Sequence, residues 1–177
     1  MLNLTPLVRP WFSRMTRESR ATVSRAGAET AQRAVLARLL RRARDTEIGR
    51  RHGFSTIGDA AAFASTLPVT SYPDLRADIL RMVSGGRDIL WPGVCRRFAQ
   101  SSGTSDGKSK YIPVTADSFS RCHYKGGADV VAHYLSLYPD SRLFAGKSFI
   151  LGGSFANELS LPPGVRVGDL SANLIEN

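Results

Sequence analysis

Long apolar runs are missing from this sequence of 177 residues. No stretch approaches the roughly 18 apolar residues that a membrane-spanning helix needs. The first 20 residues carry Arg9, Arg14, Arg17 and Arg20 but lack the continuous apolar segment of a secretory signal. We therefore expect a chain with no membrane span and a cytoplasmic location.

Cysteine is scarce as well. Cys95 and Cys122 stand apart, with no CxxC or histidine spacing around them. This pattern predicts neither a disulfide nor a metal site, and two reduced, buried thiols are expected instead. Internal repeats and low-complexity linkers are also absent. With 42% apolar and 22% charged residues, the composition is that of one ordinary globular domain.

Acidic residues are few at the start of the chain. Residues 1–51 hold 12 Arg against 4 acids, so they carry +8 of the total net charge of +9. A non-catalytic module that binds nucleic acid or an anionic membrane surface is one interpretation. Helices with solvated Arg faces are the other, and we favour it because interleaved aromatic residues and a binding-module signature are missing. No nucleic-acid partner is therefore expected.

The pattern of apolar residues and breakers predicts an α/β chain with a helical N-terminus followed by mixed strands and helices. Predicted helices cover 4–24, 28–44 and 59–65, a fourth begins after Ser71, and a fifth runs from Thr115 toward Tyr138 with a kink at Gly126-Gly127. Residues 49–54 are expected to break the helical pattern. Predicted strands cover 96–100, 110–114 and 148–151, and another begins near Arg166.

One polar segment stands between two of these strands. Residues 101–108 are hydroxyl, glycine, acid or lysine without exception. Such a segment offers little to a core, whereas its glycines, hydroxyls and lysines suit a bound anion. A P-loop would need Gly at position 102 and a helix directly after Lys108. Position 102 is Ser, and the strand-like residues Tyr111-Ile112-Pro113 stand where the helix should begin, so neither requirement is met. A plain hairpin tip is the remaining simple alternative, although a plain turn has no need of paired lysines.

The segment Ser101-Ser102-Gly103-Thr104-Ser105-x-Gly107-x-x-Lys110, followed by Ile112-Pro113, resembles the first nucleotide motif of the GH3 family of acyl acid–amido synthetases. This family lies within the acyl-adenylate-forming superfamily. Three flanking segments look like bacterial members: Gly49-Arg50-Arg51-His52-Gly53-Phe54, Leu67-Pro68-Val69 with Tyr72, and Leu90-Trp91-Pro92-Gly93. The resemblance covers most of the chain from about Ala28 onward.

The resemblance implies the N-terminal part of the large domain of an adenylate-forming enzyme. It implies a ligase that uses ATP and Mg²⁺ to activate a carboxylic acid as an acyl-adenylate, and then transfers the acyl group to an amine, usually an amino acid. The implied ATP and phosphate ligands are Ser101, Ser102, Gly103, Thr104, Ser105, Gly107, Lys108 and Lys110. Asp106 is expected to point to solvent. The resemblance names no catalytic residue and no metal ligand.

Family members run to several hundred residues. Their later nucleotide motifs, acyl-acid pocket and small C-terminal domain lie beyond this length. We therefore expect residues 1–177 to be an incomplete N-terminal domain, with a basic helical region at 1–51, a strand–phosphate loop–strand at 96–114 and no C-terminal domain. Arg166-Val167-Gly168-Asp169 matches a ribose-binding pattern, but it follows the loop too soon, and a turn and strand start are predicted there. The acyl acid, the amine and the oligomeric state are not predicted.

Overall fold

The computed structural model describes residues 2–101, 109–157 and 159–176, with only the backbone of Arg25. The chain divides into two compact units. The first comprises Met1–Gln32 and Ala116–Leu151, and the second comprises Arg33–Thr115 and Gly152–Asn177.

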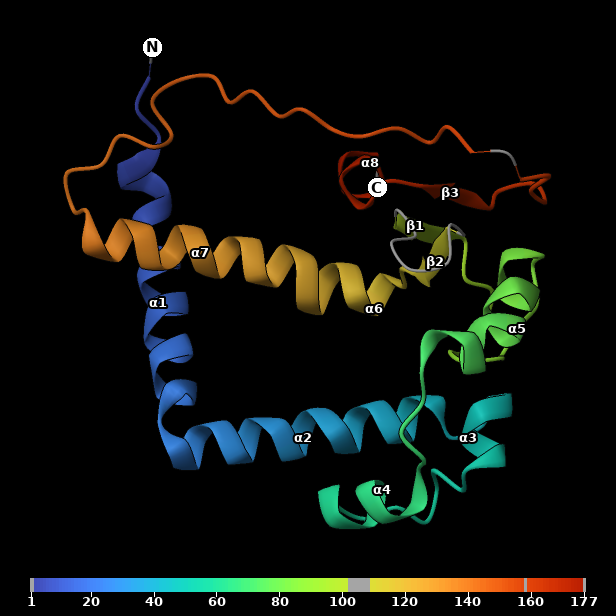
Figure 1. Ribbon diagram of the computed structural model, residues 1–177. Coiled ribbons are helices and arrows are strands. Elements are labelled where there is room, and N and C mark those ends of the chain that lie inside the picture. The colour runs from blue at the N-terminus through green and yellow to red at the C-terminus, as the bar shows by residue number, and fades with distance from the viewer. Residues whose placement is uncertain (1, 102–108, 158, 177) are drawn as a thin grey trace. The chain divides into compact units, whose positions relative to one another are not determined.

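Helices make up the described part of the first unit, and helices with a small sheet make up the second (Figure 1). The helices are α1 Thr5–Val23, α2 Arg25–Ala43, α3 Glu47–Arg51, α4 Ala60–Thr66, α5 Tyr72–Val83, α6 Ala116–Ser118, the π-helical turn η1 Phe119–His123, α7 Tyr124–Leu137 and α8 Leu170–Ile175. The strands are β1 Arg97–Ser101, β2 Lys110–Pro113 and β3 Arg166–Gly168. The α/β class predicted from the sequence is confirmed.

The first unit is built on the crossing of α1 and α7 (Figure 1). Phe12 and Met15 of α1 pack against Ala132 and Leu135 of α7, and all four are buried. The ring of Phe144 stacks on Phe12, with the two centroids 5.9 Å apart. Burial of these apolar side chains holds the two helices together.

The helical stretch after β2 is continuous from Ala116 to Leu137. Its irregularity is the π-helical turn at Phe119–His123, which comes earlier than the predicted kink at Gly126-Gly127. Phe119 is buried in this turn. The predicted place of the irregularity is therefore wrong, because one extra residue in the turn, and not glycine flexibility, changes the helix there.

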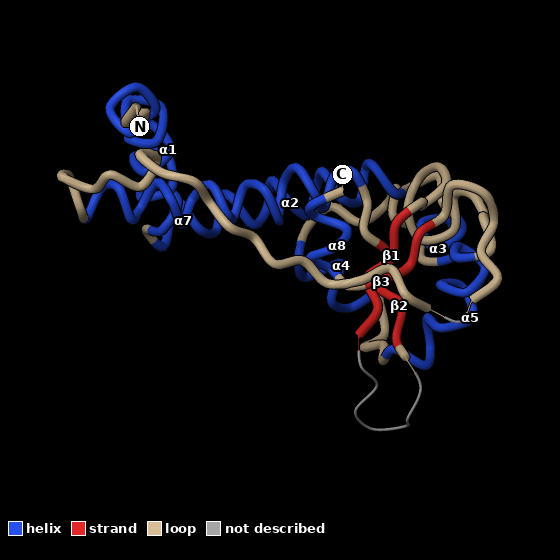
Figure 2. Tube along the Cα trace, turned by 90° about the horizontal axis from the view of Figure 1, so that it is seen from above, coloured by secondary structure: helices blue, strands red, loops and turns tan. Residues whose placement is uncertain are grey.

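Three strands form the sheet of the second unit (red in Figure 2). Their order is β2-β1-β3. Strand β1 pairs antiparallel with β2 and parallel with β3, and Phe98 lies beside Val167 in the register. Both of these side chains are fully buried. They belong to the core of the unit, whose buried members are Met82, Val83, Ile89, Cys95, Phe98, Val165 and Val167. The middle strand has no exposed residue, whereas β2 and β3 each have one.

Helix α5 begins where its sequence predicts. The Asp74 carboxylate accepts hydrogen bonds from the Ser71 main-chain N–H and hydroxyl, both at 2.7 Å. Pro73 stands within the first turn, where no intrahelical N–H is needed. The helix ends before Gly85, whose φ of +87° favours glycine. The same helix packs against β2.

The break predicted at residues 49–54 is wrong for residues 49–51, which belong to α3, and confirmed for residues 52–54, which form turns. The Thr46 hydroxyl accepts a hydrogen bond from the Gly49 N–H at 3.1 Å and donates one to the Ala43 carbonyl at 2.6 Å. A Cβ at Gly49 would lie 2.0 Å from that same carbonyl oxygen. Gly49 is therefore present for close packing of α3 on the end of α2, and not as a helix breaker.

Two further predictions are wrong. Residues 148–151 form no strand: Phe149, Ile150 and Leu151 are 90%, 73% and 83% exposed, and apolar composition alone gives a segment no neighbouring strand to pair with. Cys122 is exposed, whereas Cys95 is buried as predicted. Burial raises the pKa of the Cys95 thiol. Within the described ranges, no helix has both the length and the apolar character needed to cross a bilayer.

Candidate functional site

The two ends of the polar segment meet at one edge of the sheet. Ser101 is the last residue of β1 and Lys110 is the first residue of β2, and the antiparallel register places them directly opposite one another. Both are half-buried. The structure therefore brings together a hydroxyl and an ammonium that are nine positions apart in the sequence.

The remaining predicted phosphate ligands lie outside the described residues. They are Ser102, Gly103, Thr104, Ser105, Gly107 and Lys108. The roles predicted for these six residues, and the solvent position predicted for Asp106, stay predictions.

The element that follows Lys108 decides between two families of phosphate loop. A P-loop requires a helix whose N-terminus faces the phosphates. Here Lys110–Pro113 is a strand that pairs with β1. The P-loop interpretation is therefore excluded, and a strand–loop–strand arrangement remains.

Gln100 connects the two strands at the base of the loop. Its Nε2 donates to the hydroxyl of Ser109 at 2.9 Å. Its Oε1 is buried and, in the part of the chain that the structure describes, has no hydrogen-bond partner. Buried amide oxygens normally accept a hydrogen bond. The base of the loop thus has one unused acceptor.

Tyr72 reaches the same place from α5. Its hydroxyl accepts a hydrogen bond from the main-chain N–H of Tyr111 at 2.8 Å, and the Nζ of Lys110 lies 5.7 Å from the centre of its ring. No local pattern relates Tyr72 to the strand that follows the polar segment, because Tyr72 and Tyr111 lie 39 positions apart along the chain. Locally, the sequence shows only that Tyr72 is an aromatic residue at a capped helix start. Nothing near it in the chain indicates the contact with Lys110.

Helix α8 supports the other side of the sheet. Asn173, which is fully buried, donates through Nδ2 to the carbonyl oxygens of Phe98 and Asp169, both at 3.1 Å. Asp169 accepts from the Ser154 N–H at 2.9 Å. Residues 166–168 are strand β3, as predicted for the start of this segment.

An ionic network ties α3 to α5. Arg51 pairs with the buried Asp78 at 3.0 Å, and Arg81 pairs with Asp78 at 3.1 Å and with Glu47 at 2.7 Å. The hydrogen bond from Arg81 lowers the pKa of Glu47 and raises the pKa of Arg81. Asp78 therefore has two cationic partners, which offset the cost of its burial.

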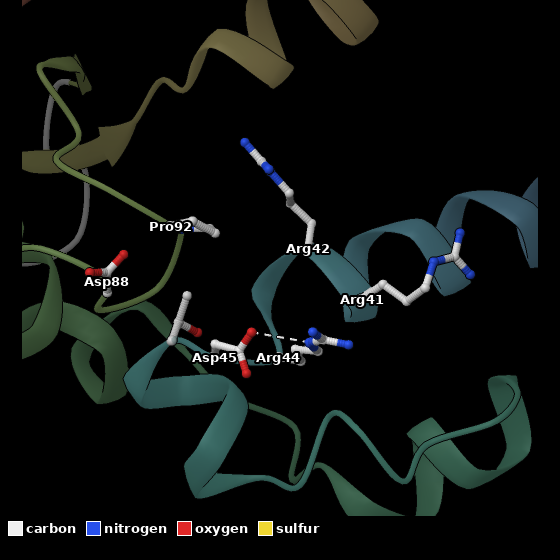
Figure 3. Close-up of a pocket in the computed structure, with 7 residues that line it drawn as sticks. Arg41, Arg42, Arg44, Asp45, Asp88 and Pro92 are labelled. Atoms are coloured by element: carbon white, nitrogen blue, oxygen red, sulfur yellow. Dashed lines mark hydrogen bonds and ion pairs between the residues drawn. The ribbon is translucent and has the colours of Figure 1, made fainter.

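A concavity of about 330 Å³ lies where α2 ends (Figure 3). It is lined by Arg41, Arg42, Arg44, Asp45, Thr46, Asp88 and Pro92. The three guanidinium groups spread apart and do not converge on one point (Figure 3), and that of Arg44 is paired with Asp45 at 3.1 Å. Donors that diverge in this way form no compact pocket for a single anion, and no other observation at this concavity supports a nucleic-acid or membrane-binding module.

Histidine and acidic side chains do not gather into a metal centre. Over residues 2–101, 109–157 and 159–176, no three His, Cys, Asp or Glu side chains lie close enough together to hold a metal ion. His52 stacks beside Phe54, with ring centroids 6.5 Å apart. His133 shares a hydrogen bond of 3.0 Å with the hydroxyl of Ser19. Both imidazole rings therefore contact neighbouring side chains of the fold.

Comparisons with known proteins agree on one family. The model of the "GH3 family N-terminal domain" matches residues 20–177. A probable indole-3-acetic acid-amido synthetase of Oryza sativa subsp. japonica is 38% identical over 96 residues, which cover 54% of this chain and 16% of that protein. An indole-3-acetic acid-amido synthetase of Arabidopsis thaliana is 34% identical over 95 residues, with 53% and 16% covered.

A solved structure agrees with these relatives. The GH3.15 acyl acid amido synthetase superposes with a TM-score of 0.65 and 26% identity, over 82% of this chain and 26% of that one. The chain thus spans a small fraction of the length of the proteins it resembles.

Proposed function

The chain belongs to the GH3 family, and from that premise we propose that it forms the N-terminal domain of an ATP-dependent acyl acid amido synthetase. The proposed reaction has two steps. A carboxylate attacks the α-phosphorus of ATP, which forms an acyl-adenylate and releases pyrophosphate. An amine, such as that of an amino acid, then attacks the acyl carbon and releases AMP. The relatives are named as amido synthetases, which supports this class of reaction.

One observation carries the assignment of this chain's part in the reaction. Ser101 and Lys110 stand opposite one another at the two ends of a segment rich in glycine and hydroxyl groups. In-line attack at the α-phosphorus requires that the leaving pyrophosphate be held and its charge neutralised. We assign this task to the segment 101–110, in which hydroxyls and main-chain N–H groups donate to phosphate oxygens and Lys110 supplies positive charge.

Mg²⁺ completes the proposal as a companion of ATP. The described residues offer no cluster of carboxylates for the ion, so it is proposed to reach the site on the phosphates of ATP. Bound there, it would neutralise part of the phosphate charge. The residues of this chain that act beside it are the donors of the segment 101–110.

The substrates are proposed by class only. The relatives are named for indole-3-acetic acid and for acyl acids in general, so an acyl acid with an apolar body and an amino acid are the proposed pair. We expect the 177 residues alone to bind ATP weakly and to catalyse no exchange between ATP and pyrophosphate. Robust exchange by these residues alone would contradict that expectation.

Pyrophosphate binding tests the proposal on this chain. Titration followed by ¹H–¹⁵N NMR is expected to shift the resonances of Ser101, Ser109 and Lys110, and Lys110→Ala should weaken the affinity about tenfold, as for loss of a charge-assisted hydrogen bond. Lys147→Ala is the matched control, since Lys147 is exposed and remote in sequence. Equal affinity of the two variants would remove Lys110 from the site.

A further inference from the structure

Tyr72 contacts both residues with which strand β2 begins. Its hydroxyl accepts the main-chain N–H of Tyr111 at 2.8 Å, while its ring lies under the ammonium of Lys110, at 5.7 Å from Nζ to the ring centre. The hydroxyl contacts the backbone of β2, and the ring contacts the side chain. A single residue therefore contacts both the strand that carries Lys110 and the ammonium itself.

The position of Tyr72 is itself well fixed. It is the first residue of α5, directly after Ser71, whose N–H and hydroxyl both bind the Asp74 carboxylate. The following turns of α5 bury Met82 and Val83 in the core of the second unit. The half-buried ring thus rests on a capped and anchored helix start, which limits its freedom.

The ring is a suitable partner for a cation that must bind phosphate. Among the residues that the structure describes, no carboxylate pairs with Lys110. A carboxylate would neutralise the ammonium and compete with phosphate for its donors. An aromatic face attracts the cation more weakly, and it leaves the charge available for an incoming anion.

We propose that Tyr72 is the positioning residue of Lys110, and that its ring holds the ammonium at the start of β2 until a polyphosphate binds. This role rests on the proposed function, since it presumes that Lys110 binds phosphate. Tyr72 itself is not assigned any contact with ATP. Its ring acts on the ammonium, and its hydroxyl acts on the strand that carries it.

The contact can be observed without any ligand. With ¹³C-labelled lysine, the ring current of Tyr72 should move the Lys110 Hε resonances upfield relative to those of exposed Lys147. Tyr72→Phe keeps the ring and should keep this shift, whereas Tyr72→Leu should abolish it. An unchanged Lys110 resonance in Tyr72→Leu would overturn the proposal at this first step.

Pyrophosphate affinity then separates positioning from mere structural support. Tyr72→Leu is expected to weaken binding about two- to fivefold in the otherwise unchanged full chain, and to change nothing in the Lys110→Ala background. Equal weakening in both backgrounds would show that Tyr72 acts only on the fold, and would overturn the proposal. Absence of pyrophosphate binding by the unsubstituted chain would instead contradict the proposed function.

A second set of variants covers the case in which Tyr72→Leu fails to fold. Phenylalanine with one, two or three ring fluorines at position 72 keeps the shape of the ring and progressively weakens its attraction for cations. We expect affinity for pyrophosphate to fall with each added fluorine, and to stay constant along the same series in the Lys110→Ala background. A flat series with Lys110 present would overturn the proposal.

Discussion

The side-chain amide of Asn173 lies 3.1 Å from the main-chain oxygen of Phe98, and this hydrogen bond joins α8 to the middle strand of the sheet. Asn173 is completely buried, and its Nδ2 also donates to the Asp169 carbonyl at 3.1 Å. Two carbonyl oxygens therefore depend on one side-chain donor. Since β1 ends at Ser101, this bond also supports the strand that leads into the polar segment.

Replacement of Asn173 by Asp should destabilise the fold. The introduced carboxylate would face the oxygens of Phe98 and Asp169 with no proton to donate, and we expect a loss of about 3 kcal/mol in the free energy of unfolding at pH 7. The loss should shrink in acid, where the protonated carboxyl can donate one hydrogen bond. Urea denaturation at pH 7 and pH 4 measures both effects.

Gln32→Glu is the control for this substitution. It makes the same change from amide to acid at an exposed position of α2, and its effect should stay within about 0.5 kcal/mol. Equal effects of the two variants would show that the Asn173 hydrogen bonds contribute nothing.

Acid should weaken the link between α3 and α5. The hydrogen bond from Arg81 lowers the pKa of Glu47 below its ordinary value of 4.5 in the folded chain. A carboxylate with a lowered folded pKa contributes stability above its unfolded pKa, and this contribution disappears as the pH falls through the folded value. Thermal unfolding between pH 6 and pH 3 should therefore show a smaller loss of stability in Glu47→Gln than in the unsubstituted chain.

Asp140→Asn serves as the reference for the pH series. Asp140 is exposed at the turn after α7, and its substitution should leave the slope of stability against pH unchanged. A slope for Glu47→Gln that matches the unsubstituted chain would show that the Arg81–Glu47 pair has no part in acid sensitivity.

The exposed apolar segment Phe149-Ile150 should promote self-association. Both side chains are largely exposed, at 90% and 73%, and they are neighbours in sequence. Exposed apolar neighbours favour contacts between molecules. Replacement of both by Ser is expected to weaken self-association of the 177-residue chain about tenfold or more, as measured by sedimentation equilibrium.

Val69→Ser distinguishes a local patch from general surface hydrophobicity. Val69 is fully exposed but stands between Pro68 and Thr70, without apolar neighbours in the chain. Its substitution should leave the association constant unchanged. An effect of Val69→Ser as large as that of the double substitution would contradict the assignment of the patch to Phe149-Ile150.

The parts of the fold that local chemistry determines could be predicted from the sequence. Ser71, Pro73 and Asp74 place the start of α5, and the apolar residues on both sides of the polar segment predict β1 and β2. Each of these signals acts within a few residues. The helix cap made by Asp74 and the two strands beside the polar segment can therefore be predicted without knowledge of any residue distant in the sequence.

Features that depend on distant partners could not be predicted. From the sequence alone, Gly49 looks like a helix breaker. The structure shows another reason for glycine, because a Cβ at this position would lie 2.0 Å from the carbonyl oxygen of Ala43. The parallel pairing of Phe98 with Val167 and the contact of Tyr72 with Lys110 join segments that no local pattern relates. The exposure of Phe149 has the same origin, since only a neighbouring strand would have made its segment part of a sheet.

Exchange of labelled pyrophosphate into ATP by the protein in its full encoded length tests most directly whether the segment 101–110 handles phosphate during carboxylate activation. With a panel of carboxylic acids, we predict that exchange requires one of these acids. Its rate should fall about 100-fold or more in Lys110→Ala and stay unchanged in Lys147→Ala. Exchange that is the same in Lys110→Ala and Lys147→Ala, or no exchange with any acid, would contradict the proposed function.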